Sequence, residues 1–466
     1  MGTPWNRCRI VAIVAGATLV LTGAGCALQN LREEASSSLT VDCGVQHQTI
    51  EGFGAACAFW DASSATVYAD PAFQDRIAND LGLSILRFEV NPRLQLREDL
   101  NAGVLNLDTF DFEALRVAGD LAGALQPRVG DDFKLICSVW SPPAWMKTNG
   151  STRNGGALRA DRVPHFAKYC AGLCQGFEKT YRVPIHAMSL QNEPLFAEPY
   201  DSCVYTAAQL RDVTQAVRAA FSKEGVTTRL MGHEDVGCGF ARRYAALLAP
   251  TMRDAPKALD FCCIHGYAGD GRTAETSRRN WMSLRDALAP YKRALWMTET
   301  SGHAHDTWNG GMAAARHIHE SLTYGNCAAW LYWQLTMPHG KVGYALCLDG
   351  QPTLKYHAVK HFFRYVRPGS VRVDAGPDTS GLNISAFTRH ADRSLTIVLI
   401  NNESAPRRAV IRLDRLPWPI ASFAQFHSTR HEPCVEAEEI SVASDGSVTL
   451  EIPGSAIVTL RAQASL

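Results

Sequence analysis

Compact apolar, β-rich runs recur through the middle of the chain, and amphipathic helical patterns separate most of them. Helical periodicity is clearest over Val163–Thr180, Ala207–Glu224 and Gly311–Tyr324. The runs number eight and are Gly52–Ala58, Ser84–Val90, Leu135–Val139, Ala187–Leu190, Arg229–Met231, Phe261–Ile264, Ala294–Met297 and Ala328–Trp333. A closed parallel barrel requires eight strands, most of them followed by a helix. We therefore predict an α/β protein with a (β/α)8 TIM barrel over residues 51–362. An open doubly wound sheet is the alternative.

The pattern changes after Val366-Arg-Pro-Gly, where no convincing helix follows. Runs such as Leu395–Ile400, Ala409–Leu413 and Val448–Ile452 lie between turn residues and favour an antiparallel β-sandwich over residues 363–466. Near the N-terminus, residues 39–50 predict two short strands around a turn at Gly44, with no helical partner of their own. We therefore expect the N-terminal strands to join the C-terminal region in one appended sandwich.

The first residues have the layout of an export signal. Arg7 and Arg9 precede the apolar run Ile10–Leu21, and small residues follow it, so residues 1–26 are predicted to be a signal peptide. Ala24-Gly25-Cys26 also resembles a bacterial lipoprotein box, in which Cys26 would carry a lipid anchor. The apolar run is too short for a permanent membrane span. We expect an extracytoplasmic chain, secreted, periplasmic or lipid-anchored to the cell envelope, with residues 27–38 as a linker.

Composition narrows the classes of partner. In 466 residues Lys plus Arg and Asp plus Glu are both 46, so no basic excess exists to bind nucleic acid. Of 14 cysteines, Cys8 and Cys26 fall in the predicted signal, and the rest show no Cys-x-x-Cys metal or redox spacing. We interpret them as buried small side chains or structural bridges, and we expect a monomer.

Two glutamates stand where predicted barrel strands end. Glu193 follows the fourth run in Ser189-Leu-Gln-Asn-Glu-Pro, and Glu299 ends the seventh in Leu295-Trp-Met-Thr-Glu-Thr. Active sites of such barrels lie at the carboxyl ends of the strands, and a carboxylate there is costly to desolvate unless it is paired or used. Each alone could be a solvated loop residue or an ion-pair partner. Together they suit retaining glycoside hydrolysis, which needs two carboxyl groups about 5–5.5 Å apart.

Five motifs along the chain resemble glycoside hydrolase family 30, in that family's order and over nearly the whole mature chain. They are Thr49-Ile-Glu-Gly-Phe-Gly-Ala, Trp140-Ser-Pro-Pro-Ala-Trp-Met-Lys, Gln191-Asn-Glu-Pro, Trp296-Met-Thr-Glu-Thr and Trp330-Leu-Tyr-Trp-Gln. The resemblance implies a retaining double displacement with Glu193 as general acid/base and Glu299 as nucleophile. It also places Arg87 close to the nucleophile, and a histidine and an aromatic residue, His265 and Tyr267, near it.

Further residues are candidates for substrate binding. Asn192 is placed to bond the sugar 2-hydroxyl, although an asparagine before a proline is also a common turn residue. Trp140 and Trp333 lie at strand ends, where rings stack on sugar faces or simply fill barrel layers. Trp145 shares this ambiguity. A lone histidine such as His265 is often structural, and Arg87 could instead pair with Glu89.

Other chemistries fit the sequence less well. Gly52-x-Gly54 lacks the third glycine of a dinucleotide fingerprint, and His303-Ala-His305 and His317-Ile-His319-Glu320 lack the spacing of a known zinc motif. We therefore predict no cofactor and no metal. A non-catalytic carbohydrate-binding protein on the same scaffold, or a retaining glycosidase of another barrel family, are the alternatives.

The substrate is predicted only as a class. We predict a β-linked oligo- or polysaccharide, with polysaccharide degradation as the role and endo-β-1,6-glucanase, xylanase or a related activity as the reaction. The resemblance implies that family members recognising glucuronic acid use a basic side chain in the loops after the late strands. Over Met337–Tyr344 this chain offers only Lys341, which disfavours glucuronoxylan.

Overall fold

The computed structural model describes residues 36–58, 62–95, 97, 105–267, 274–303, 307–338, 343–379 and 381–464. The predicted signal peptide, the lipid box at Cys26, residues 27–35 of the predicted linker, His305 and Lys341 lie outside these residues.

Eight parallel strands close into a barrel. Each strand pairs with the next in chain order, and the last pairs with the first, with Gly52 opposite Ala329 and Ala55 opposite Tyr332. The alternative of an open sheet is therefore wrong, because this pairing leaves no free edge. The strands are β2 (Gly52–Cys57), β3 (Ile85–Val90), β4 (Lys134–Val139), β5 (Ala187–Ser189), β6 (Arg229–Asp235), β7 (Phe261–His265), β8 (Leu295–Glu299) and β9 (Cys327–Tyr332).

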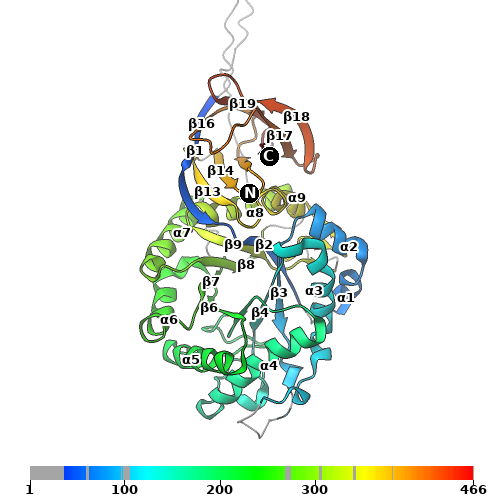
Figure 1. Cartoon of the computed structure of the whole chain (residues 1–466), viewed down its shortest axis with the longest axis vertical. Coiled ribbons are helices and arrows are strands. Elements are labelled where there is room, and N and C mark those ends of the chain that lie inside the picture. The colour runs from blue at the N-terminus through cyan, green and yellow to red at the C-terminus, as the bar shows by residue number, and fades with distance from the viewer. Residues whose placement is uncertain are drawn as a thin grey trace, which may run out of the picture. The chain divides into compact units, whose positions relative to one another are not determined.

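The barrel strands are buried along their length because apolar side chains cover both faces. One set fills the barrel interior, with Ile85, Ile136, Met231, Phe261 and Trp296 among its members. The outward set packs under the helices, which Figure 1 shows around the outside of the strands. The helices are α1 (Ala62–Tyr68), α2 (Pro71–Asp75), α3 (Arg116–Val129), α4 (Val163–Tyr181), α5 (Ala207–Glu224), α6 (Ala241–Asp254), α7 (Ala274–Leu288), α8 (Trp308–Thr323) and α9 (Leu354–Phe363).

Local sequence sets the bounds of α5 in particular. Thr206 and Gln209 form a capping box at its start, each bonding the other's backbone N–H. The helix ends at Glu224 and is capped by Gly225, whose φ of 69° suits a residue without a Cβ. The predicted range of this helix is confirmed.

Close packing between the first two barrel strands depends on Gly54. A Cβ at this position would lie 1.8 Å from the carbonyl oxygen of Ile85 on β3. The motif glycine thus allows the two strands to approach.

The second core belongs to a nine-stranded, mostly antiparallel sheet, ordered β18-β17-β20-β15-β14-β13-β1-β16-β19. The predicted sandwich built from both ends of the chain is confirmed, since β1 lies between β13 and β16. The bounds are β1 (Ser36–Thr49), β13 (Val371–Gly376), β14 (Leu382–Arg389), β15 (Ser394–Asn401), β16 (Arg407–Asp414), β17 (Ser422–Ser428), β18 (Val435–Ser441), β19 (Ser447–Ile452) and β20 (Ala456–Gln463). A short sheet of β10 (Thr336–Met337), β11 (Cys347–Leu348) and β12 (Gln351–Pro352) follows the last barrel strand.

The N-terminal strand differs from its prediction in two respects. It is one strand of 14 residues, and Gly44 lies in an irregular stretch where the pairing with β13 shifts register between Asp42 and Gln46. The predicted turn is wrong because a bulge absorbs the extra residues without reversing the chain. The strand also begins at Ser36, where parallel pairing with Arg408 of β16 extends it into the predicted linker.

Buried histidines on α8 and α9 connect the barrel to the sandwich. His319 on α8 lies 2.6 Å from Ser385 Oγ and 2.7 Å from Asp378 Oδ2. His361 on α9 lies 2.7 Å from Thr459 Oγ1 and 2.8 Å from Ser428 Oγ. His319, from the motif His317-Ile-His319-Glu320, thus uses both of its ring nitrogens in structural contacts.

None of the twelve cysteines of the described chain forms a disulfide, and all but Cys434 are buried. Of the two interpretations, small buried side chains are correct and bridges are wrong for these residues. Among the helices that the structure describes, none has the length and apolar character needed to cross a membrane.

Candidate active site

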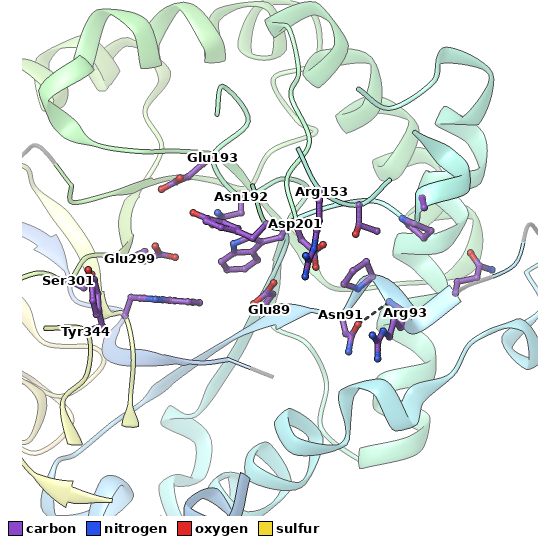
Figure 2. A pocket seen from close by; sticks show the side chains of 18 of the residues that line it. Glu89, Asn91, Arg93, Arg153, Asn192, Glu193, Asp201, Glu299, Ser301 and Tyr344 are labelled. Carbon is purple, nitrogen blue, oxygen red and sulfur yellow. Dashed lines mark hydrogen bonds between the residues drawn. The ribbon is translucent and has the colours of Figure 1, made fainter. Parts of the chain in front are cut away.

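A cavity of about 1140 Å³ opens at the carboxyl ends of the barrel strands, and both predicted catalytic glutamates line it. Glu299 is the last residue of β8, and Glu193 follows β5 by four residues. Figure 2 shows the two carboxylates in the same part of the cavity. Parallel strands place their carboxyl ends on one face of the barrel, which is why residues far apart in sequence meet here.

Glu299 is held by a cation and a hydroxyl. Arg87 Nη1 lies 2.6 Å from its Oε2, and the Tyr267 hydroxyl donates to its Oε1 at 2.8 Å. Burial, and then the charge of Glu299, raises the pKa of Tyr267, so this hydroxyl keeps its proton and donates. Both contacts stabilise an ionised carboxylate at Glu299.

Arg87 is fully buried on β3 and contacts the site through all three guanidinium nitrogens. Beyond Glu299, Nη2 lies 2.8 Å from Asn192 Oδ1 and 3.1 Å from Glu234 Oε1, and Nε donates to Ser138 Oγ at 3.1 Å. Burial alone would lower the pKa of Arg87, but the charges of Glu234 and Glu299 outweigh it and raise the pKa. Arg87 is therefore a permanent cation under the cavity floor.

Glu193 contacts a different group. His265 Nδ1, on β7, lies 2.9 Å from Glu193 Oε1 and 3.7 Å from Glu299 Oε1. The backbone of Glu193 has a φ of 46°, uncommon for a side chain with a Cβ, and its N–H donates to the Glu234 carbonyl at 2.8 Å. Strand β6 thus fixes Glu193 in a conformation that a free turn would rarely adopt.

The histidine is surrounded by carboxylates. Burial alone would lower the pKa of His265, but Glu299, Glu193 and Glu234 together raise it to about 10. At neutral pH the ring is an imidazolium, and both of its N–H groups are donors.

Glu234 is the main residue of the site that sequence reasoning missed. It is fully buried on β6, 3.1 Å from Arg87 Nη2 and 3.6 Å from His265 Nε2. Burial would raise the pKa of Glu234, but the charges of Arg87 and His265 hold it well below its ordinary value. The sequence pattern did not reveal Glu234, because the stretch Met231-Gly-His-Glu-Asp is polar like a loop. In the structure, β6 continues through this stretch.

Aromatic side chains line the cavity beside the glutamates. The rings of Trp140 and Trp333 lie 5.6 Å apart, and Arg87 lies 4.7 Å from the Trp140 ring centroid. Trp333, Trp140, Tyr267 and Asn192 line the cavity, while Arg87 and His265 are buried behind its surface. Trp145 does not line it, and its Nε1 donates to the carbonyl of Gln95.

Three groups of the site could also be considered as metal ligands. Glu193, His265 and Glu299 each offer an atom within 4.8 Å of the others. Two features disfavour a cation there: an imidazolium has no free lone pair, and the Arg87 guanidinium already neutralises Glu299 at 2.6 Å. The same closeness of the two carboxylates suits retention, since inverting enzymes hold theirs about 6.5–9.5 Å apart.

The cavity continues beyond the glutamates to residues from three loops. Figure 2 shows Asn91, Arg93, Arg153 and Asp201 away from Glu299, Ser301 and Tyr344. The complete additional lining comprises Glu89, Asn91, Pro92, Arg93, Gln95, Pro143, Ala144, Thr152, Arg153, Tyr200, Asp201, Ser301 and Tyr344. None of these was a sequence candidate, because loop residues meet only through the fold.

The motif histidines outside the site have structural partners. His317 Nδ1 accepts from Trp330 Nε1 at 2.9 Å, and the His303 ring lies 5.4 Å from the His317 ring. Burial lowers the pKa of His303 well below its usual range.

Comparisons with known proteins agree with this architecture. No family model matches the chain. It is 24% identical over 383 residues to the glucuronoxylanase XynC of Bacillus subtilis, covering 79% of each chain. It is 23% identical over 411 residues to the putative glucosylceramidase 1 of Caenorhabditis elegans, covering 78% of this chain and 76% of that one.

Among solved structures, the chain is similar to the glycoside hydrolase family 30 subfamily 8 xylanase Xyn30A of Clostridium acetobutylicum. The TM-score is 0.76 at 23% identity, covering 92% of this chain and 100% of that one. The predicted barrel with an appended sandwich is confirmed.

Proposed function

We propose that this chain, whose predicted resemblance to glycoside hydrolase family 30 the comparisons confirm, is a retaining β-glycosidase that degrades polysaccharide through Glu299 and Glu193. The class of enzyme, a glycoside hydrolase, is likewise confirmed. The observation that carries the assignment of residues is the contrast between the two carboxylates. Glu299 is bound by Arg87 at 2.6 Å and by a tyrosine hydroxyl, whereas Glu193 faces only His265 among the contacts described above.

In the first step Glu299 attacks the anomeric carbon and Glu193 gives its proton to the departing glycosidic oxygen. The C–O bond to the leaving sugar breaks as the bond to a Glu299 oxygen forms, giving a covalent glycosyl-enzyme. Asn192, oriented by Arg87 Nη2 at 2.8 Å, is placed to bond the 2-hydroxyl as the oxocarbenium-like transition state develops. Trp140 and Trp333 offer rings to the apolar faces of the sugar.

In the second step Glu193 takes a proton from water, and the resulting hydroxide attacks the same carbon. Glu299 leaves as a carboxylate, and Glu193 is again protonated, so the anomeric configuration is retained. The surrounding charges suit this cycle. Arg87 and His265 supply two positive charges, Glu299 and Glu234 two negative ones, so the buried cluster is neutral when Glu193 carries the proton.

The substrate we propose is a β-linked glycan, with xylan and β-1,6-glucan as the first polymers to test. Among the similar proteins, XynC and Xyn30A are xylanases, and others are endo-β-1,6-glucanases. Lys341, the one basic side chain predicted to bear on glucuronic acid, lies outside the described residues. We further propose that the enzyme is an exported monomer, either with residues 1–26 removed as a signal or with Cys26 retained as a lipid attachment site.

Substitution of each glutamate tests the mechanism. Glu299→Ala should abolish turnover, and more than ~10% residual activity would refute the nucleophile assignment, because a double displacement cannot proceed without it. Glu193→Ala should still form the glycosyl-enzyme from substrates with good leaving groups, and azide should restore turnover. Glu224→Ala is the control that should keep wild-type activity, since Glu224 is a half-buried glutamate at the end of α5 and does not line the cavity.

Product analysis on a polysaccharide panel tests the proposed substrate. Release of reducing ends with retained configuration is the expected result. Calorimetric binding of an oligosaccharide without any release of reducing ends would identify a non-catalytic carbohydrate-binding protein instead.

A further inference from the structure

The motif that supplies Trp140 ends in a buried lysine that the proposed chemistry does not use. Lys147 is only 3% exposed and lies in the loop after β4, directly after the short turn Ala144–Met146. Its Nζ donates to the carbonyl of Thr152 at 3.2 Å and to the carbonyl of Ser202. These two carbonyls belong to different loops, so one ammonium group bridges them.

Both loops are joined by further hydrogen bonds into a single layer, called here the distal wall (residues 148–158 and 194–204). The Ser202 N–H donates to the Thr152 carbonyl at 2.9 Å, so this oxygen accepts from both Ser202 and Lys147. Ser202 Oγ accepts from the N–H of Gly155 at 2.9 Å and from that of Glu198 at 3.0 Å. The wall has no strand or helix of its own, so these contacts determine its shape.

The distal wall carries a distinct part of the cavity lining. Thr152, Arg153, Tyr200 and Asp201 line the cavity, and a backbone bridge pairs Arg153 with Asp201. In Figure 2 the last pair lies on the opposite side of the cavity from Glu299, Ser301 and Tyr344. Tyr200 is 50% exposed, and an exposed ring of this kind is a surface on which a sugar can stack.

The wall adjoins Glu193 through the backbone, since the Phe196 N–H donates to the Glu193 carbonyl at 2.9 Å, but the side chains that perform the reaction have other partners. Glu193 is held by the Glu234 carbonyl and by His265, and Glu299 by Arg87 and Tyr267. Lys147 touches none of them in the contacts described. A loss of the ammonium bridge should therefore alter how a long glycan is held and leave bond cleavage intact.

We infer that Lys147 is a positioning residue that holds the distal wall in place, and that the wall, through Tyr200, Arg153 and Asp201, forms a subsite for a glycan unit beyond the bond that is cleaved. This inference rests on the proposed function. A subsite away from the glutamates improves binding only for chains long enough to reach it, so the enzyme should favour longer glycans.

The test compares oligosaccharides of increasing length, prepared from the polymer that the wild type cleaves best. In the wild type, kcat/KM rises with length until the distal subsite is filled. In Lys147→Met the KM for the longest oligosaccharide rises about fivefold, the size of one aromatic contact, while kcat stays unchanged. Tyr200→Ala should give the same loss. Because the Tyr200 ring is exposed, this variant should fold like the wild type.

Lys134→Met is the matched control. Lys134 begins β4, the strand that precedes the loop of Lys147, and its Nζ donates to the Glu51 carbonyl at 2.8 Å. This variant should keep the wild-type dependence on length. Hydrogen exchange measured by mass spectrometry should be faster over residues 148–158 and 194–204 in Lys147→Met and unchanged there in Lys134→Met.

Each outcome decides the inference. An unchanged length dependence in both Lys147→Met and Tyr200→Ala would overturn it, as would a wild type whose kcat/KM does not rise with length. A fall in kcat for all lengths would show that Lys147 supports the catalytic groups instead. If Lys147→Met does not fold, Tyr200→Ala and Ser202→Ala decide in its place. A wild type that hydrolyses no oligosaccharide would refute the proposed function itself.

Discussion

Replacing Glu234 by glutamine should change the ionisation of a residue that it does not replace, His265. The substitution keeps the shape of the side chain and removes one buried negative charge. Glu234 lies 3.6 Å from His265 Nε2 and 3.1 Å from Arg87 Nη2, with no solvent exposure. Because a nearby negative charge favours the imidazolium, its removal must lower the pKa of His265.

The size of the effect follows from the distance. Two unit charges about 4 Å apart interact by about 4 kcal/mol at an effective dielectric constant of ~20. Since 1.36 kcal/mol corresponds to a tenfold change, this is about a thousandfold in the ionisation equilibrium. The pKa of His265, about 10 in the wild type, should then fall into the neutral range. Arg87 keeps its charge, because Glu299 remains 2.6 Å away.

The pH dependence of kcat/KM and a histidine NMR titration measure this change. Glu234→Gln should show a new ionisation near neutral pH, which a second substitution, His265→Gln, should remove. Asp235→Asn is the control, because this neighbouring carboxylate on β6 is also buried but pairs with Arg243 at 2.9 Å. If Glu234→Gln and the wild type share one profile, or if Asp235→Asn gives the same shift, Glu234 does not govern His265.

Three further predictions follow from features of the fold. Gly54→Ala should lower the free energy of unfolding by about 3 kcal/mol or more, because the new Cβ would meet the Ile85 carbonyl at 1.8 Å. Gly343→Ala is the control, because a Cβ there has open space, and equal melting temperatures of the two variants would contradict the prediction. At most one cysteine of the native described chain, Cys434, should react readily with a thiol reagent, since the others are buried, and several fast-reacting thiols would refute the packing. The melting temperature should fall as pH rises from 6.5 towards 10, because a histidine whose folded pKa is raised stabilises fully below its ordinary pKa and loses that stabilisation as pH passes its folded value. His265→Gln should flatten this slope in calorimetry, and a wild type with no slope would contradict the assignment.

The barrel could be predicted from the sequence because its strands are buried on both faces. Runs such as Phe261–Ile264 are almost wholly apolar, and the helices between them show the 3.6-residue period. The two proposed catalytic glutamates stood out for the same reason, since Glu299 ends such a run and Glu193 follows one within a few residues. A change from apolar to acidic at a strand end is a local signal.

The parts that could not be predicted depend on contacts between distant residues. Glu234 is buried because Arg87 and His265, far away in sequence, compensate its charge. Its own surroundings in the sequence are polar. Similarly, Tyr200 reaches the cavity only because Lys147 and Ser202 tie two loops together. Gly44 shows that even a local feature can depend on distant residues. A glycine suits either a turn or a bulge, and the pairing of β1 with β13 determines which of the two forms.

The polar contacts of His319 and His361 with the sandwich have a consequence for how the molecule can be shortened. A chain ending at residue 362 would lose Ser385 and Thr459 and expose both imidazoles, together with the apolar surface around them that Phe387, Val398 and Ile457 cover. It would also lose the two strands between which β1 is inserted. The catalytic barrel is therefore not an independent module: removal of the sandwich should give insoluble protein, and calorimetry of the whole chain should show one cooperative transition.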